Sequence, residues 1–244
     1  MVGIGPGLEG DITARARSTI IGSDLVAGYK TYLSIIKDLI KDKPTLGSGM
    51  GEEKERCQAA LEEASKGKKV SLVSSGDPGV YGMAGLVLEL ASRGDPMGRP
   101  YSAVSIEVVP GVPASCAASA LLGAPLAHDH AIISLSDLLT PWELIEKRLR
   151  LAAEGDFSIV LYNPKSSQRT WQIERTRQIL LEYHPATLPV GIVKDAGRPG
   201  QAVFITTLDK MLEFPIDMTT IIIIGNSTTF VHNGFMITKR GYKL

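Results

Sequence analysis

The segment Lys69-Val-Ser-Leu-Val-Ser-Ser-Gly-Asp-Pro-Gly79 decides the fold, because it joins a β-type run directly to a glycine turn. Residues 69–74 have the apolar and β-branched composition of a short strand. Ser75-Gly-Asp-Pro-Gly79 has the composition of a tight turn, and helical periodicity follows over residues 83–93. A strand, a turn and a helix in this order predict one step of a parallel β-α-β sheet.

Similar turns follow three other expected strands. They are Gly3-Ile-Gly-Pro-Gly7 after a brief strand at 2–4, Pro110-Gly-Val-Pro113 after 105–109, and Gly225-Asn-Ser227 after 220–224. In open α/β sheets, ligands bind outside the carboxyl ends of strands, where glycine lets the backbone approach closely. Four such turns in one chain predict a binding crevice.

The remaining pattern changes character after Pro125. In the first part we expect a strand at 24–26 and helices at 11–23 (capped by Asp11), 31–40, 52–66 and 114–122. In the second part we expect strands at 131–135, 157–161, 189–193 and 203–206, and helices at 142–153 and 168–183. The short link between 193 and 203 favours antiparallel pairing.

These elements predict an α/β protein with two lobes. Residues 1–125 would form an N-terminal lobe with a parallel sheet, and residues 126–244 a C-terminal lobe with a mixed sheet.

Composition limits the classes of partner. Lys plus Arg and Asp plus Glu both number 26, so the chain lacks the excess of positive charge that duplex-binding proteins use, and we expect no nucleic-acid partner. No charged segment followed by an apolar core opens the chain, and no apolar run approaches the roughly 20 residues that cross a bilayer. We therefore expect no membrane association and a cytoplasmic location.

The first glycine turn differs from the dinucleotide-binding fingerprint. Its spacing is G-x-G-x-G, and Leu8 stands where the third glycine of G-x-G-x-x-G belongs. Pro6 also removes an N–H that a pyrophosphate would use. A nicotinamide-dependent oxidoreductase is therefore a remote alternative. The chain has no P-loop, nucleophile elbow or H-E-x-x-H zinc motif.

Two other features could suggest a metal. On a strand, His128 and His130 would share one face, but no third ligand is apparent, so we expect no metal site. Cys57 and Cys116 match no metal-binding spacing. We expect Cys57 to be exposed on a charged helix and Cys116 to be packed among small residues.

Taken together, the motifs resemble the tetrapyrrole methylases, the class III S-adenosylmethionine-dependent methyltransferases. The resemblance covers residues 2 to about 229 and rests on these segments in order: Val2-Gly-Ile-Gly-Pro-Gly7, Ser75-Gly-Asp-Pro-Gly-Val-Tyr-Gly82, Val109-Pro-Gly-Val-Pro-Ala114, Gly123-Ala-Pro-Leu126, Leu161-Tyr-Asn-Pro164 and Gly225-Asn-Ser227. Within the family, Gly28-Tyr-Lys-Thr-Tyr32 and the segment 134–142 are most similar to the precorrin-3B and cobalt-factor III C17-methyltransferases.

The resemblance implies a two-lobed homodimer that binds S-adenosylmethionine in the cleft between lobes and releases S-adenosylhomocysteine. The donor-binding residues that it implies are Pro6, Ser75, Gly76, Asp77, Val80, Ala114, Ser115, Tyr162, Asn163 and Ala196. Asp77 would accept a hydrogen bond from the donor's ammonium or ribose. The implied reaction is methylation at C17 with contraction of the macrocycle, and a sibling acting at another ring carbon is the alternative.

The implied substrate is a tetrapyrrole rich in carboxylates, bound near Tyr29. Ring contraction needs proton movement, for which the candidates are Lys30, Ser136, Asp137 and His128. Basic residues that could pair with the carboxylates are Arg15, Arg17, Lys30, Lys165, Arg169 and Arg198. One departure concerns Leu8, since many relatives have an acidic residue after Gly-Pro-Gly. Glu9 or Asp11 could take its place.

Overall fold

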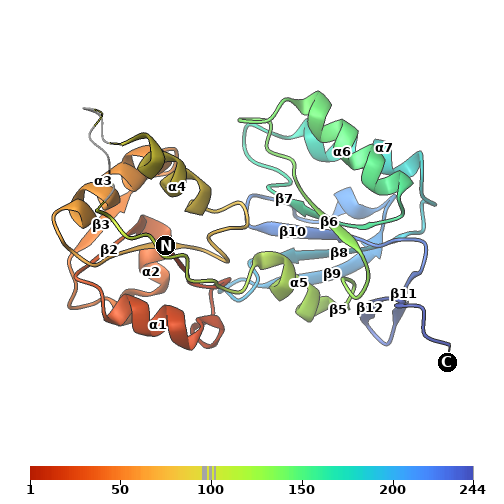
Figure 1. Ribbon diagram of the computed structural model, residues 1–244. Helices are drawn as coiled ribbons and strands as arrows, with labels where there is room; N and C mark the ends of the chain where they lie inside the picture. Colours follow the sequence, from red (N-terminus) through yellow and green to blue (C-terminus); the bar gives the residue numbers. More distant parts are fainter. Residues whose placement is uncertain (95–97, 99–100, 102, 244) are drawn as a thin grey trace. The chain divides into compact units, whose positions relative to one another are not determined.

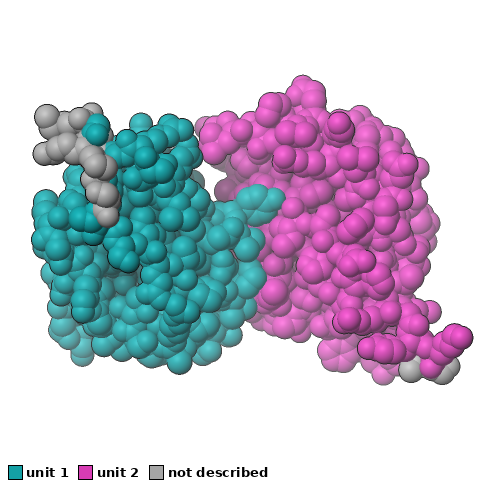
Figure 2. Space-filling view, in the orientation of Figure 1, with its two compact units in different colours: residues 1–114 teal, residues 115–244 magenta. Residues whose placement is uncertain are grey.

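The computed structural model describes residues 1–94, 98, 101 and 103–243, and it divides into two compact units, residues 1–114 and 115–244 (Figure 2). The division falls at the start of α5 (Ala114–Leu122), earlier than the expected boundary at 125. The reason is that β5 (Gly123–Ala124), which follows α5 directly, pairs in parallel with β12 (Phe235–Thr238) of the second unit.

The first unit contains a four-stranded sheet of order β1-β4-β2-β3 in which every pairing is parallel (Figure 1). The strands are β1 (Val2–Gly3), β2 (Leu25–Tyr29), β3 (Thr45–Ser48) and β4 (Val70–Ser74). The predicted parallel lobe is thus confirmed. Strand β3 was not predicted, because it is short and contains a glycine. Residues 105–109 form no strand, and only Val109 makes an isolated bridge, to Val2.

Helices cover both faces of this sheet. On one face of the sheet, Val26 and Val73 pack against α1 (Ala14–Ile21) and α2 (Lys30–Ile35). On the other face, Ala27 and Leu72 pack against α3 (Glu53–Ser65) and α4 (Ala84–Arg93). Neighbouring strand residues point to opposite faces, so both faces are buried, as is usual for a parallel sheet.

Two of the expected helices in the first unit differ most from the structure. Thr13, and not Asp11, caps α1, since its Oγ1 accepts from the Ala16 N–H at 3.1 Å. Asp11 instead ends a short 3₁₀ turn, η1 (Glu9–Asp11). The expected helix over 31–40 ends with α2 at Ile35 and is followed by a separate 3₁₀ turn, η2 (Lys37–Leu39).

The prediction for the two cysteines was wrong. Cys57 is buried and Cys116 is exposed. Although α3 is rich in charge, it turns Cys57 toward the core beside Leu61 and Leu72. Burial raises the pKa of the Cys57 thiol to about 11, so this thiol is protonated and unreactive at neutral pH.

The second unit contains a five-stranded sheet of order β6-β7-β10-β8-β9. Its strands are β6 (His130–Ser134), β7 (Ser158–Tyr162), β8 (Pro189–Lys194), β9 (Ala202–Thr207) and β10 (Thr220–Ile224). Strands β6 and β7 are parallel, while β10 is antiparallel to both of its neighbours. The mixed sheet is confirmed, as is the antiparallel pair β8–β9, in which Val193 lies opposite Val203.

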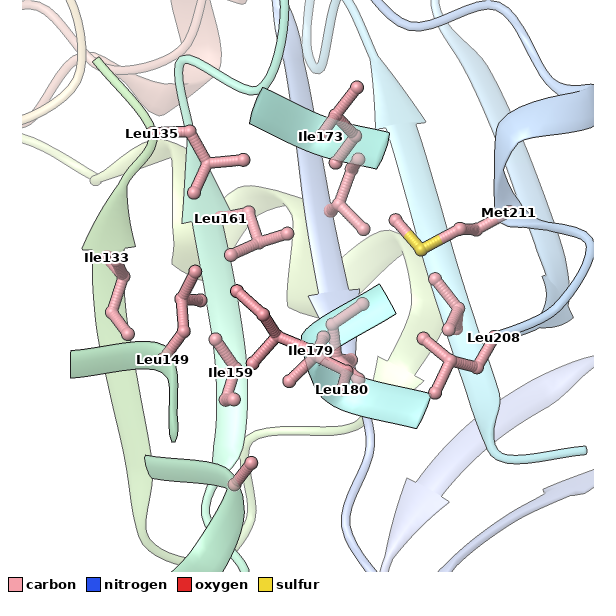
Figure 3. Close-up of a cluster of buried hydrophobic side chains, with 14 of the residues drawn as sticks. Ile133, Leu135, Leu149, Ile159, Leu161, Ile173, Ile179, Leu180, Leu208 and Met211 are labelled. Atoms are coloured by element: carbon pink, nitrogen blue, oxygen red, sulfur yellow. The ribbon is translucent and has the colours of Figure 1, made fainter. Parts of the chain in front are cut away.

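One face of this sheet carries the largest apolar cluster, beneath α6 (Trp142–Glu154) and α7 (Trp171–Leu181) (Figure 3). Leu149 and Ile179 from these helices pack with Leu161 and the 3₁₀ turn η3 (Met211–Glu213). A separate small sheet, β11-β12-β5, was not predicted; β11 is Thr229–His232. No helix in the described part of the chain is long and apolar enough to cross a membrane.

Gly191 in β8 packs tightly against α5. A Cβ at this position would lie 2.3 Å from Cδ1 of Leu122, which is fully buried and cannot move aside. We therefore predict that Gly191→Ala lowers the free energy of unfolding by about 1–3 kcal/mol, as overpacking does in cores. Denaturant unfolding measures this. Gly85→Ala is the control, since that helical glycine has no neighbour within 4 Å and the substitution should be neutral or stabilising by up to about 1 kcal/mol. Equal stability of Gly191→Ala and the wild type would contradict the prediction.

Candidate functional site

Three glycine turns of the first unit meet at the carboxyl ends of β1 and β4. The Gly5 N–H donates to the Gly76 carbonyl at 3.2 Å, and the Gly76 N–H donates back to the Gly5 carbonyl at 2.8 Å. A Cβ at Gly111 would lie 2.2 Å from the Gly76 oxygen, and one at Gly3 would lie 2.6 Å from the Gly111 nitrogen. The three backbones approach so closely that only glycine fits at their contacts.

Asp77 holds two of these turns together. Its Oδ1 accepts from the Gly79 N–H at 2.8 Å, and its Oδ2 accepts from the Gly111 N–H at 3.0 Å. Hydrogen bonds to a carboxylate are stronger than those between neutral groups. Asp77 was expected to bind a ligand. In this structure it has a structural role, because both of its carboxylate oxygens accept hydrogen bonds from backbone amides.

Six of the predicted donor-binding residues lie at or beside these turns. Pro6 is buried in the first turn, and Ser75, Gly76 and Asp77 form the second. The Ala114 nitrogen is 3.6 Å from the position of a Cβ on Gly76. Val80 continues the second turn, where its N–H donates to the Asp77 carbonyl at 3.3 Å.

The residues after the first turn are exposed. Leu8 is 57% exposed, and the carboxylate of Glu9 pairs with Arg17 at 2.6 Å. Arg15 pairs with Glu107. Arg15 and Arg17, two of the basic residues expected near the substrate, are therefore each paired with an acidic side chain of the same unit.

In the second unit, strand direction gathers the predicted residues at one edge of the sheet. Strands β7 and β8 are both antiparallel to β10, and β6 is parallel to β7, so β6, β7 and β8 end at the same edge. Ser136 and Asp137 follow β6, Tyr162 ends β7 and Asn163 follows it, and Ala196 follows β8.

The turn at residues 225–227 lies at the opposite edge, which corrects the expectation that all four glycine turns face one crevice. It follows β10, the strand that runs the other way. Asn226 Nδ2 donates to the Asp156 carbonyl, and the Ser227 N–H donates to Asp156 Oδ1, just before β7 begins.

Hydrogen bonds connect the residues at the shared edge. The Ser115 N–H donates to the Tyr162 hydroxyl at 2.9 Å, which ties the start of α5 to the end of β7. Asn163 has a left-handed backbone (φ 51°), and its Nδ2 donates to Ser134 Oγ at 2.9 Å. Ser134 Oγ also accepts from the Ser136 N–H at 3.2 Å. The ends of β6 and β7 are thus fixed relative to each other.

Two further side chains support this edge. Arg169 Nη1 donates to the carbonyls of Asn163 (2.9 Å) and Leu135 (3.3 Å), so this arginine, expected to meet substrate carboxylates, holds the two strand ends instead. Gln172 Nε2 donates to Asp137 Oδ2 at 2.9 Å. Gln172 was not predicted as a site residue, because it belongs to no motif. Its position on the inward face of α7 is the one feature of the sequence that could have indicated a buried role.

His128 is not brought together with Ser136 and Asp137. It precedes β6, whereas they follow it, and at about 3.3 Å per strand residue the two ends are well separated. Its Nδ1 accepts from the Asp129 N–H, and its ring is half exposed. Lys30 belongs to the first unit, where it is exposed at the end of β2. Within the described ranges, no three His, Cys, Asp or Glu side chains are arranged to hold a metal ion.

The Ala196 turn is braced by an ion pair. Lys194 Nζ lies 2.6 Å from Asp217 Oδ2, and the Asp195 N–H donates to the Thr219 carbonyl at 3.2 Å. Partial burial of Asp217 opposes its ionisation, but hydrogen bonds from Lys194 and Thr219 outweigh burial and lower its pKa from 3.8 to about 2.

Residues 1–212 match the tetrapyrrole (corrin/porphyrin) methylases, and the chain belongs to this family. A probable cobalt-factor III C(17)-methyltransferase of Salmonella typhimurium strain LT2 is 48% identical over 244 residues, which cover 100% of this chain and 99% of that protein. A precorrin-3B C(17)-methyltransferase of Sinorhizobium sp is 40% identical over 229 residues, 94% of this chain and 89% of that protein. The crystal structure of the methyltransferase CobJ superposes with a TM-score of 0.91 at 34% identity and covers 98% of both chains. The family and the fold class predicted from the motifs are confirmed.

The role of Asp77 in joining two turns can be tested by Asp77→Asn. Asparagine offers one accepting oxygen, and its NH₂ group would face the second backbone N–H. We predict a loss of about 1–3 kcal/mol in the free energy of unfolding, the range for a hydrogen bond to a charged group. Chemical denaturation measures it, with the exposed Asp42→Asn as control. A variant as stable as the control would show that the carboxylate does not hold the turns.

The low pKa of Asp217 predicts a pH dependence of stability. Because the folded-state pKa lies below the unfolded one, the stabilisation is present above about pH 4 and is lost as the pH falls toward 2. Asp217→Asn should be less stable than the wild type at pH 7, and the difference should shrink between pH 4 and pH 2. Urea unfolding at several pH values measures this; a difference independent of pH would contradict it.

Proposed function

We propose that this protein transfers a methyl group from S-adenosylmethionine to C17 of a corrinoid precursor and promotes contraction of its ring. The observation that carries the proposal is the set of interlocked glycine turns at 3–7, 75–79 and 110–113, in a chain that belongs to the tetrapyrrole methylases. The relative that is 48% identical over its whole length bears a name for this reaction. That name favours cobalt-factor III over precorrin-3B as the substrate.

The donor-binding residues that we propose are those that the family resemblance implies. The backbone of residues 75–80 would bind the donor where no bulky side chain intervenes, together with Pro6 and Ala114. Tyr162 and Asn163 would frame the adenine or the ribose, and Ala196, which is small, would leave room beside them. The fit rests on these small residues and on the backbone polar groups at the ends of the strands.

When bound, S-adenosylmethionine supplies an electrophilic methyl group on a positively charged sulfur. The protein's contribution is alignment of that group with the accepting carbon, which can account for on the order of 7–11 kcal/mol of the barrier. Interlocked turns and linked strand ends suit this task, because they limit the movement of the groups that hold the two reactants.

For the proton transfers of ring contraction, Ser136 and Asp137 remain the candidates, with Lys30 from the first unit. The hydrogen bond from Gln172 orients the Asp137 carboxylate. His128, at the far end of β6, is left out of this proposal. We also propose that the protein is cytoplasmic, and that it is a homodimer, as the family resemblance implies.

The first test is calorimetric titration with S-adenosylmethionine and S-adenosylhomocysteine, with NADH and NADPH as controls. We expect micromolar binding of the two sulfur nucleosides only. Product analysis by mass spectrometry with cobalt-factor III and with precorrin-3B then identifies the substrate.

Methylation of cobalt-factor III with ring contraction would support the proposal. Methylation at another carbon would favour a sibling activity, and binding of a nicotinamide in place of the sulfur nucleosides would refute the assignment.

A further inference from the structure

A buried guanidinium lies at the carboxyl end of the first sheet, away from the glycine turns described above. Arg56, in the first turn of α3, is only 5% exposed. Its Nη2 donates to the Gly49 carbonyl at 3.1 Å, and its charge lies 5.8 Å from the centre of the Tyr29 ring. Glu53, which is half exposed, approaches it only to 3.7 Å. Among the described residues, Arg56 Nε has no hydrogen-bond partner.

Such a group calls for a partner. A buried charge is costly unless it is paired and hydrogen-bonded, and a bound water or ion is one explanation for a buried donor without a partner. A second unsatisfied group lies beside it, since Ser48 Oγ is also buried without a partner in the described part of the chain. Ser48 and Arg56 both line a cavity of about 350 Å³.

In the turn that follows β3, two backbone amides donate hydrogen bonds to glutamate side chains of the same chain. The Gly49 N–H donates to Glu52 Oε2 at 2.6 Å, and the Gly51 N–H donates to Glu53 Oε1 at 3.2 Å. Both glutamates are exposed and can turn toward solvent. They stand at the start of α3, where backbone N–H groups and the helix dipole favour negative charge.

The side-chain stem of Lys30 also passes close to β3. Strands β2 and β3 lie side by side with Tyr29 opposite Ser48 (Figure 1). A Cβ on Gly47 would lie 3.3 Å from Lys30 Cγ, so the lysine stem crosses the end of β3. Polar donors on β3, on the turn after it and on helices α2 and α3 thus lie around the end of β3, together with the acidic residues Glu52, Glu53 and the cavity-lining Glu55.

We propose that this turn binds one carboxylate arm of the tetrapyrrole, an inference that rests on the proposed function. The arm takes over the amides of Gly49 and Gly51 from the two glutamates and pairs with Arg56 and Lys30. In the absence of substrate, Glu52 and Glu53 occupy these amides and compete with the arm. Lys30 is thereby assigned to substrate binding in addition to its candidacy for proton transfer.

Competition gives the proposal a test in which two variants change affinity in opposite directions. Arg56→Gln should raise the Kd for cobalt-factor III at least tenfold, as measured by absorbance titration without the methyl donor. The KM for cobalt-factor III should rise by a similar factor, while kcat should stay within about twofold of the wild-type value. Glu53→Gln should lower the same Kd about two- to fivefold, because it removes the competing carboxylate. Arg93→Gln, an exposed arginine paired with Glu89 in the same unit, is the matched control and should leave both constants unchanged.

Arg56→Lys, which keeps the charge and loses the Nε donor, should give an intermediate Kd and guards against a folding defect in Arg56→Gln. If Arg56 only supports the fold, Glu53→Gln would weaken binding or leave it unchanged, and either result overturns the proposal. Wild-type affinity in Arg56→Gln also overturns it. If the wild-type protein itself does not bind cobalt-factor III, both the proposed function and this inference are refuted. This outcome is seen before any variant is made, so it is not confused with a failure of this inference alone.

Discussion

The structure of the first unit depends on the contact between the backbones of three turns, which Asp77 secures. β1 has only two residues, too few to be stable alone. Its hydrogen bonding continues past the strand, however, because the Ile4 N–H donates to the Ser74 carbonyl at 2.9 Å and Gly5 pairs with Gly76. The carboxylate of Asp77 then ties the turn after β4 to Gly111. The hydrogen bonds of β1 are thereby continued into the turn that follows it.

The second unit follows a different constraint, the direction of β10. Because this strand lies antiparallel between β7 and β8, it leaves the carboxyl ends of β6, β7 and β8 at one edge and sends its own end to the other. The polar residues at the shared edge are then fixed by Arg169 and Ser134, whose hydrogen bonds join the ends of β6 and β7. The same arrangement explains why Asn226 contacts Asp156 and lies far along the strand from Tyr162.

Much of this could be predicted from local patterns, since the strand–turn–helix unit at 69–93 and the antiparallel pair β8–β9 depend on neighbouring residues. The short strands β3, β5, β11 and β12 were missed because their stability comes from distant partners, as in the pairing of Met236 with Gly123. The positions of the candidate site residues also depend on distant parts of the chain, so they were only partly predictable from sequence. Sequence order alone did not reveal that β10 runs antiparallel to β7 and β8, or that Arg56 is buried although its helix is rich in charged residues.

The locked turns also have a thermodynamic consequence for ligand binding. Fixing the backbone of one residue costs roughly 1–2 kcal/mol of conformational entropy, and in a flexible loop this cost falls on the binding step. Here Gly5, Gly76 and Gly111 are already hydrogen-bonded or clamped by Asp77 when the chain is folded. The conformational entropy of these turns is therefore lost when the chain folds and not when a ligand binds. A ligand that contacts these turns binds to a backbone that is already ordered. Its affinity is then decided by direct contacts and not by the work of arranging the loops.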